Sequence, residues 1–234
     1  VICNVTPTQL YQRLLNPSDV PQDIAMKTRQ WRYGKGNMQI HLALSEAPQW
    51  PSAALGQVGY LHLTSGPDAV SRAVNEAERD LLPAEPTVCV AQPTALDPSR
   101  APEGQHILWI QVPECPREPV ADAAGEIAVP PGRKWTPQLR EAFADRVMER
   151  IARHVPNLRQ SLLSRVVLSP ADLEGLNMNL VGGDPYGGDC SLDQSFLWRP
   201  LRATRNHETH VANLWHIGAS THPGPGLGGG SGVY

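Results

Sequence analysis

Glycine is concentrated near the C-terminus of this 234-residue chain, directly after a short apolar stretch. Six of the nine residues from 224 to 232 are glycine. Because glycine has no Cβ atom, such residues let backbone N–H groups approach a large ligand closely, at a cost in chain entropy. The apolar stretch at 214–217 predicts a buried strand that leads into the turn, and a helix is expected next, which would aim N–H groups at one point. The run therefore predicts a site for a large cofactor that carries negative charge.

A flavin fits this prediction, because its reduction places negative charge on one edge of the ring system. The run also contains the pattern GxGxxG, at Gly224, Gly226 and Gly229. This pattern indicates dinucleotide binding only when a helix follows and an acidic residue lies about 20 positions later. The chain ends at Tyr234, so neither feature can be read, and the glycine content alone is equally typical of an unstructured tail or a linker.

Five stretches, in order along the chain, carry a family resemblance: residues 1–7, 97–106, 169–174, 182–200 and 214–232. The second reads DPSRAPEGQH and the third SPADLE, while the fourth contains GG, DQ and RP. In this order they resemble motifs of the phytoene desaturase-like flavoproteins, a branch of the FAD-dependent amine oxidase superfamily. The resemblance covers nearly the whole chain, although residues 20–90 match only in pattern.

The resemblance implies a protein of two lobes. A Rossmann-type lobe would bind FAD, and a second lobe, a mixed sheet flanked by helices, would cover the substrate over the flavin ring. The implied divisions are the end of the FAD-binding lobe with a connecting helix (1–17), the substrate-covering domain (18–175) and a flavin-contacting segment (176–234). The family's first glycine motif, which grips the pyrophosphate, is absent here. We therefore expect weak FAD binding, or none, unless a separate or removed N-terminal segment is supplied.

The resemblance also implies which residues line the flavin. These residues are Gly218, Ala219, Ser220, Thr221, His222, Gly226, Leu227, Gly228 and Gly229. The sequence departs from the family pattern where Pro225 interrupts the glycine run and where Gly230 replaces a common alanine. His222 is the one candidate for catalysis, and it either polarises substrate or flavin or only bonds to backbone around the turn.

Three residues are candidates for the substrate side: Gly183, Tyr186 and Arg199. Arg199 either holds the loop next to the cofactor or pairs with a carboxylate in the core. Tyr186 stands in a glycine-rich loop and faces either the substrate or solvent.

Other residues could suggest different chemistry. The stretch His207-Glu208-Thr209-His210 does not match HExxH, and its histidines are expected to be structural or to face solvent, so no metal site is predicted. Ser220, His222 and Asp184 could be read as a hydrolase triad. The chain contains no GxSxG pattern, however, so a hydrolase is not favoured.

Helices and strands alternate along the chain, which favours an α/β (α+β) fold. Period-two alternation is clearest at 38–44, within a region of strands expected at 26–47. Apolar residues four apart at 139, 143, 147 and 151 predict one face of a long helix. Further strands are expected at the N-terminus and at 59–63, 88–91, 107–112 and 214–217. Helices are expected at 7–16, 67–81 and 136–154, with a short one from 170, and no regular structure is expected at 113–134.

The composition restricts the possible partners. A net charge of −3 and 41% apolar residues give no electrostatic argument for nucleic acid or an anionic membrane. No apolar run reaches the roughly 18 residues that span a bilayer, and no signal peptide is visible. The four cysteines form no CxxC pair, so we expect free thiols and a cytoplasmic location. The abrupt apolar start at Val1 suggests a processed piece.

Taken with the resemblance, these features predict an FAD-dependent oxidoreductase that transfers hydride from a largely apolar small molecule to flavin. The absence of a convincing general base fits a desaturase or dehydrogenase. Two alternatives stay open: a flavin amine or amino-acid oxidase, and a non-catalytic binding or assembly subunit that needs a separate FAD-holding chain. A charged substrate would require a buried carboxylate or an arginine clamp in the central domain.

Overall fold

A computed structural model gives the structure of the chain and describes residues 1–201 and 207–226. The residues form two compact units. The sheet unit is Lys35–Asp172, and the terminal unit combines Val1–Gly34 with Leu173–Tyr234. The chain thus divides after Gly34 and after Asp172, whereas the sequence motifs predicted divisions after residues 17 and 175. The assignment of flavin and substrate roles to these units stays a prediction.

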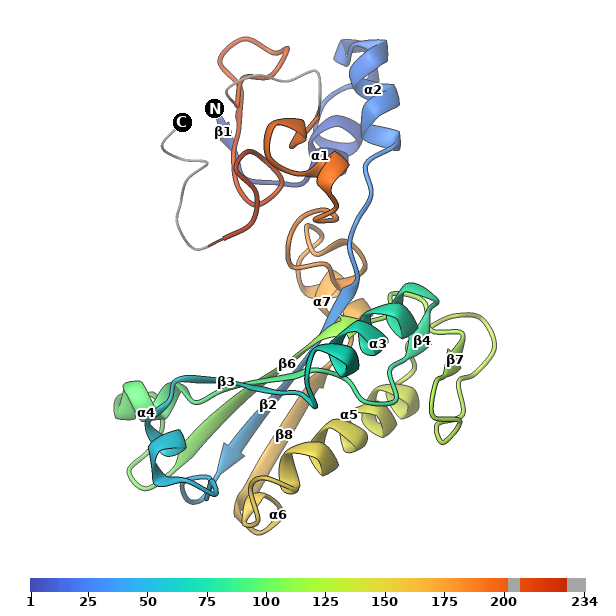
Figure 1. Ribbon diagram of the computed structural model, residues 1–234. Coiled ribbons are helices and arrows are strands. Elements are labelled where there is room, and N and C mark those ends of the chain that lie inside the picture. The colour runs from blue at the N-terminus through green and yellow to red at the C-terminus, as the bar shows by residue number, and fades with distance from the viewer. Residues whose placement is uncertain (202–206, 227–234) are drawn as a thin grey trace. The chain divides into compact units, whose positions relative to one another are not determined.

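The sheet unit is built on five antiparallel strands (Figure 1). Their order across the sheet is β3 (Tyr60–Leu63), β5 (Val88–Ala91), β6 (His106–Cys115), β2 (Gly36–Leu44) and β8 (Leu162–Leu168). In β2, the alternate residues Met38, Ile40, Leu42 and Leu44 are at most 1% exposed. The period-two pattern at 38–44 therefore buries one face of the sheet, and the α/β (α+β) class is confirmed.

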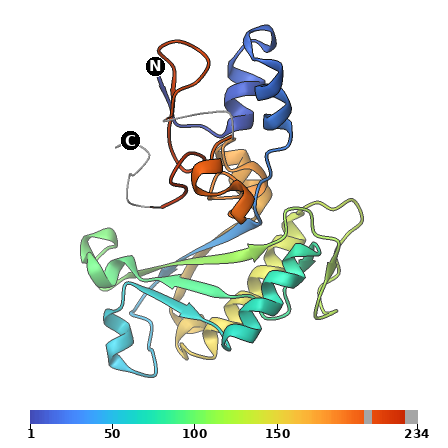
Figure 2. The ribbon, with the colours of Figure 1, turned by 45° about the horizontal axis from the view of Figure 1, so that its top comes forward.

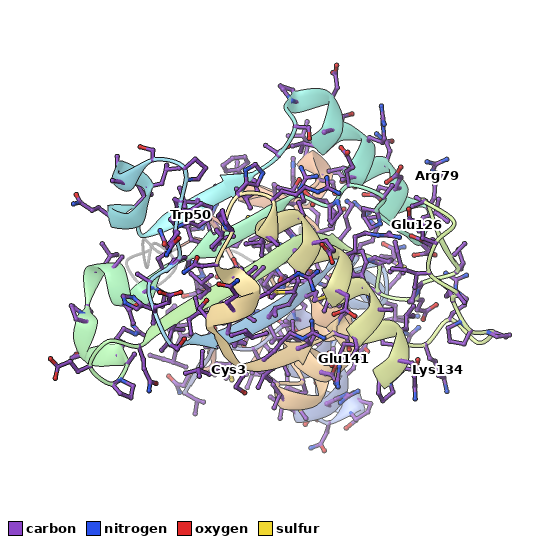
Figure 3. The ribbon with its side chains drawn as sticks, turned by 90° about the horizontal axis from the view of Figure 1, so that it is seen from below. Cys3, Trp50, Arg79, Glu126, Lys134 and Glu141 are labelled. Atoms are coloured by element: carbon purple, nitrogen blue, oxygen red, sulfur yellow. The ribbon has the colours of Figure 1, made fainter. Side chains whose placement is uncertain are left out.

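Two helices, α3 (Pro67–Glu78) and α5 (Pro137–Ala152), cover the same face of this sheet (Figures 1 and 2). Figure 3 looks onto that face, with α5 in front of the strands and Glu141 on the helix. The hydroxyl of Thr136 caps α5 by accepting the N–H of Leu139 at 3.2 Å. The predicted stripe of four apolar residues is confirmed as a core face, because all four are at most 2% exposed.

Shorter elements complete the sheet unit. Two-residue strands β4 (Leu81–Leu82) and β7 (Ala121–Asp122) pair in parallel, apart from the main sheet. The others are the 3-10 turns η3 (Ala53–Gln57) and η4 (Pro98–Arg100) and the short helices α4 (Pro93–Leu96) and α6 (Leu158–Ser161). Arg146 on α5 donates to both oxygens of Asp122 on β7, at 2.6 and 2.7 Å, which fastens β7 to the helix.

The terminal unit has a separate apolar core around Leu10, Tyr11, Ile24 and Trp31. Helix α1 (Pro7–Gln9) continues as the π-helical turn η1 (Leu10–Leu14), which agrees with the helix predicted at 7–16. A 3-10 turn, η2 (Pro17–Asp19), and helix α2 (Gln22–Arg29) follow. Helix α7 (Pro170–Leu176) begins in the sheet unit and ends in the terminal unit. The returning segment then contains η5 (Val181–Gly183), η6 (Leu192–Gln194), η7 (Phe196–Trp198) and strand β9 (Trp215–His216). Asp172 completes the predicted cap of α7, because its Oδ2 accepts the N–H of Ser169 at 2.9 Å.

Three element predictions are wrong. The strand region expected from residue 26 begins instead with the second half of α2. The helix expected to reach residue 81 ends at Glu78, and Asp80 then turns the chain with a φ of +58°. The segment 113–134 is mostly irregular, but β6 runs on to Cys115 and β7 lies within it.

All four cysteines are described and all carry free thiols, as predicted. No helix within residues 1–201 and 207–226 is long and apolar enough to cross a membrane.

Candidate functional site

The predicted glycine run begins at a strand pair that joins the two ends of the terminal unit. Strand β1 (Ile2–Cys3) pairs in parallel with β9, with Ile2 opposite Trp215 and Cys3 opposite His216. The N–H of Ile217 then donates to the carbonyl of Cys3 at 2.9 Å. Strand β9 therefore leads directly to Gly218, as the sequence predicted.

Gly218 is required at its position for two reasons. Its φ is +102°, and a Cβ atom there would lie 1.9 Å from Oδ1 of Asn4. Its carbonyl accepts both the N–H of Thr221, at 3.0 Å, and the hydroxyl of Thr221, at 2.8 Å. The N–H of Gly224 donates in turn to the carbonyl of Thr221 at 2.7 Å. Residues 218–224 therefore form consecutive tight turns against the end of β1.

A second glycine turn, residues 184–188, packs against the first. The hydroxyl of Ser220 donates to the carbonyl of Gly187 at 2.7 Å, and a Cβ on Gly187 would lie 2.6 Å from that hydroxyl. The buried carboxylate of Asp184 organises this turn by accepting the N–H groups of Tyr186, at 2.7 Å, and Gly188, at 2.9 Å. The two turns can approach this closely only because residue 187 is glycine.

Arg199 lies between the two glycine turns and is only 3% exposed. Its Nη2 donates to the carbonyl of Gly188 at 2.5 Å, and its guanidinium lies 5.6 Å from the centre of the Trp31 ring. A Cβ on Gly224 would come 3.4 Å from Nη1. Within the described residues Arg199 has no carboxylate within salt-bridge distance, and its Nε has no hydrogen-bond partner. A buried positive charge therefore lies next to the predicted cofactor turn.

Most of the predicted site residues come together in this unit. The first turn contains Gly218, Ala219, Ser220, Thr221 and His222. Gly226 follows it, and no described residue comes within 4 Å of a Cβ atom placed there. Of the predicted substrate-side residues, Gly183 is buried at the start of the second turn, Arg199 lies beside it, and Tyr186 is 49% exposed. Leu227, Gly228 and Gly229 lie outside the described residues.

The histidines of the 207–210 stretch both bind main-chain oxygen. His207 donates from Nδ1 to the carbonyl of His216 at 3.0 Å, and His210 donates from Nε2 to the carbonyl of Asp19 at 2.8 Å. In the part of the chain that the structure describes, no group of three or more His, Cys, Asp or Glu side chains could hold a metal ion.

Sequence reasoning missed three residues that shape the site: Asn4, Trp31 and Asp184. Asn4 and Trp31 are separated from the glycine run by more than 180 residues, so no local signal connects them with it. Asp184 stands before Pro185 in a glycine-rich loop, a setting in which aspartate commonly bonds to backbone N–H groups two residues on. That signal could have identified its role.

Comparison with known proteins shows relatives that are oxidoreductases. The chain is 31% identical over 161 residues to mouse pyridine nucleotide-disulfide oxidoreductase domain-containing protein 2, which covers 69% of this chain and 26% of that protein. It is 26% identical to a zeta-carotene-forming phytoene desaturase of Myxococcus xanthus (97% and 39%) and 27% identical to a lycopene-forming phytoene desaturase of Paracoccus (94% and 39%). No family model matches.

These relatives define the class of the chain as oxidoreductase-like. More narrowly, they confirm that it is related to the phytoene desaturase-like proteins that its motifs resemble. The chain spans about a quarter to two fifths of the length of these curated relatives. A crystal structure of an oxidoreductase from Methanosarcina mazei aligns with 99% of this chain and 40% of its own, at 14% identity and a TM-score of 0.44.

Proposed function

We propose that this chain is the C-terminal portion of an FAD-dependent oxidoreductase. In this proposal the enzyme moves hydride from a C–H or C–N bond of a largely apolar small molecule to flavin, as a desaturase or dehydrogenase. The names of the relatives support the reaction class, since several are phytoene desaturases. The observation that carries the proposal is the pair of glycine turns with Arg199 buried between them.

The residues of the terminal unit fit a flavin. Gly226 leaves bare backbone, because no atom of the described residues lies within 4 Å of a Cβ position there, so a flat ring could approach. Arg199 supplies a fixed positive charge beside Gly224. Such a charge would stabilise the negative charge of a reduced flavin held by this turn. Bound FAD would supply the redox chemistry itself. Gly218 to His222, Gly226, Leu227, Gly228 and Gly229 would hold it, and His222 is the candidate for polarising substrate or flavin.

In this proposal the two units would have different roles. The terminal unit would be the flavin side, with the strand pair β1–β9 at the edge of a Rossmann-type lobe. The sheet unit would cover the substrate and exclude water, which positions the reacting bond and protects the hydride. A segment that grips the pyrophosphate, separate or removed, would supply the rest of the FAD site.

An FAD titration followed by amide NMR tests the flavin site even if binding is weak. We expect FAD, up to millimolar concentration, to shift the amide signals of Gly218, Gly224 and Gly226. The variant Gly226→Leu should raise the dissociation constant about tenfold, because its side chain enters space that no described residue fills. The matched control is Gly56→Leu. A Cβ atom at Gly56 also has no described atom within 4 Å, but Gly56 lies in the sheet unit. Equal affinity in Gly226→Leu and the parent would contradict the proposal, and so would turn signals that stay unshifted when the pyrophosphate-binding segment is also supplied.

A further inference from the structure

A cavity of about 380 Å³ lies in the sheet unit, beside the last turns of α5. Arg146, Arg150 and Arg153 form one wall, and their spacing of four and then three residues places them on one face of the helix. A second wall is the loop 84–86, between β4 and β5, and a third consists of residues that follow β7. All three walls belong to Lys35–Asp172, so none of their residues is part of the predicted flavin site.

Hydrogen bonds hold these walls in place without any ligand. Arg146 donates to both oxygens of Asp122 on β7, and its Nη1 also donates to the carbonyl of Pro83 at 3.1 Å. The N–H of Ala84, the next residue of that loop, donates to Oε2 of Glu76 at 3.0 Å. Since the loop is already fixed, a ligand that binds here would spend little free energy on ordering it.

Three charged side chains on these walls have no ion-pair partner among the residues that the structure describes: Arg150, Arg153 and Glu85. Within the same residues, the side chain of Arg150 makes one hydrogen bond, from Nη2 to Oγ of Ser65 at 3.3 Å. Its Nη1 has no described partner and, unlike its Nε, is not shielded from solvent. Arg153 and Glu85 are exposed. A ligand can therefore reach all three charged groups.

The other charged side chains that line the cavity have partners. Glu149 pairs with Arg159, and Glu126 lies 3.3 Å from Nη2 of Arg146. The charges left for a ligand are two positive ones on α5 and the negative one of Glu85. An anion would be repelled by Glu85, and a cation would be repelled by the two arginines. A molecule that carries both charges would find an opposite charge for each.

We propose that this cavity binds a small zwitterion that carries a carboxylate and an ammonium group, such as an amino acid. The carboxylate accepts hydrogen bonds from Nη1 of Arg150 and from the guanidinium of Arg153. The ammonium group donates to the carboxylate of Glu85. The organic part of the molecule lies against Pro86 and Ala124, which are uncharged residues of the lining. This second site goes beyond the proposed function and does not depend on it.

Three forms of one amino acid separate the two charges: leucine, leucinamide, which lacks the carboxylate, and N-acetylleucine, which lacks the ammonium group. Each is titrated into the chain at constant ionic strength and pH 6.5, where the amino groups are protonated. Binding is followed by the backbone amide NMR signals of Glu85, Ala124 and Arg150. We expect leucine to bind with a millimolar dissociation constant, about threefold to fivefold more tightly than either other form, because an exposed ion pair contributes little.

Two variants show which wall recognises which charge. In Arg150→Gln the preference for leucine over leucinamide should fall below about twofold, while the preference over N-acetylleucine stays. In Glu85→Gln the preference over N-acetylleucine should fall instead. Arg100→Gln is the matched control, because it changes the net charge equally. Arg100 is exposed, lies in η4 of the same unit and does not line the cavity, so both preferences should stay.

Positive charge in the last turn of α5 is favourable even without a ligand, so binding and not stability is the test. The inference is overturned if leucine binds no more tightly than the other two forms or if no form shifts the three signals. It is also overturned if Arg150→Gln and Arg100→Gln show the same preferences. The comparison of the three forms needs only the unmodified chain, so it decides the question even if a variant does not fold.

Discussion

Asp184 shows how one side chain organises the candidate site. It is fully buried, and its two oxygens accept three main-chain N–H groups, from Gly34, Tyr186 and Gly188. Burial raises the pKa of Asp184, against the opposing effect of these N–H groups and of nearby Arg199. Its role is therefore to fix the second glycine turn and the chain at Gly34, rather than to act as a base.

The variant Asp184→Asn tests this role. Asparagine keeps the shape, but its NH₂ group would face an N–H donor, so we expect a loss of about 1–3 kcal/mol in the free energy of unfolding. Urea denaturation followed by tryptophan fluorescence measures it. Asp189→Asn serves as the control, because that side chain lies in the same loop, is 36% exposed and should change stability by less than about 1 kcal/mol. Equal losses in the two variants would show that Asp184 has no special role.

At the scale of elements, sequence patterns predicted those that present a regular apolar face. Helix α5 has a capping threonine and a stripe at intervals of four, and strand β2 alternates strictly, so both were predictable. Edge strand β8 was missed because it does not alternate. Leu163 and Val166 are both more than half exposed, while Arg165 reaches Asp145 and Glu141 on α5, at 2.6 and 2.7 Å.

Helix α2 was missed for a related reason. No side chain caps it after Pro21, and only Ile24 and Thr28 of its eight residues are buried. The glycine turn at 218 was predictable from composition, but its contacts were not. Asn4, Trp31 and Arg199 are brought to the turns by tertiary packing, which a local pattern does not encode.

The ion pair between β7 and α5 allows a prediction at the scale of elements. The side chain of Asp122 is 1% exposed, and removing one partner of such a pair leaves a buried charge. Asp122→Asn should therefore cost about 3 kcal/mol in the free energy of unfolding, measured by thermal or urea denaturation. Asp145→Asn, which removes an exposed partner of Arg165, should cost less than about 1 kcal/mol. A similar cost in both variants would contradict the role of Asp122 in holding β7 against α5.

The carboxylate of Asp122 also makes the free energy of unfolding depend on pH. Burial alone would raise the pKa of Asp122, but hydrogen bonds from Arg146 and from the N–H groups of Ile127 and Glu126 hold it below its usual value. A lowered pKa in the folded state gives stability that is complete above the unfolded pKa of about 3.9 and is lost as the pH falls below it. The difference in unfolding free energy between wild type and Asp122→Asn should therefore shrink below about pH 4.

At the scale of the whole molecule, the chain contains two separate apolar cores. Phe143 and Leu10 are at most 1% exposed, one in each core. Leucine or phenylalanine to alanine in such a position costs about 2–5 kcal/mol. Phe143→Ala should lower hydrogen-exchange protection mainly within Lys35–Asp172, and Leu10→Ala mainly within the terminal unit. Uniform loss of protection throughout the chain in either variant would show that the two units unfold together.

The pairing of β1 with β9 has a consequence for biosynthesis. Strand β1 cannot pair until β9, at residues 215–216, has been translated. The sheet unit, Lys35–Asp172, is by contrast continuous in sequence. On a ribosome, which adds about 5–20 residues per second, the five antiparallel strands can assemble before the glycine turns have been translated. Residues 1–34 meanwhile expose an apolar surface whose covering segment has not yet been translated, and it is these residues that would need a chaperone.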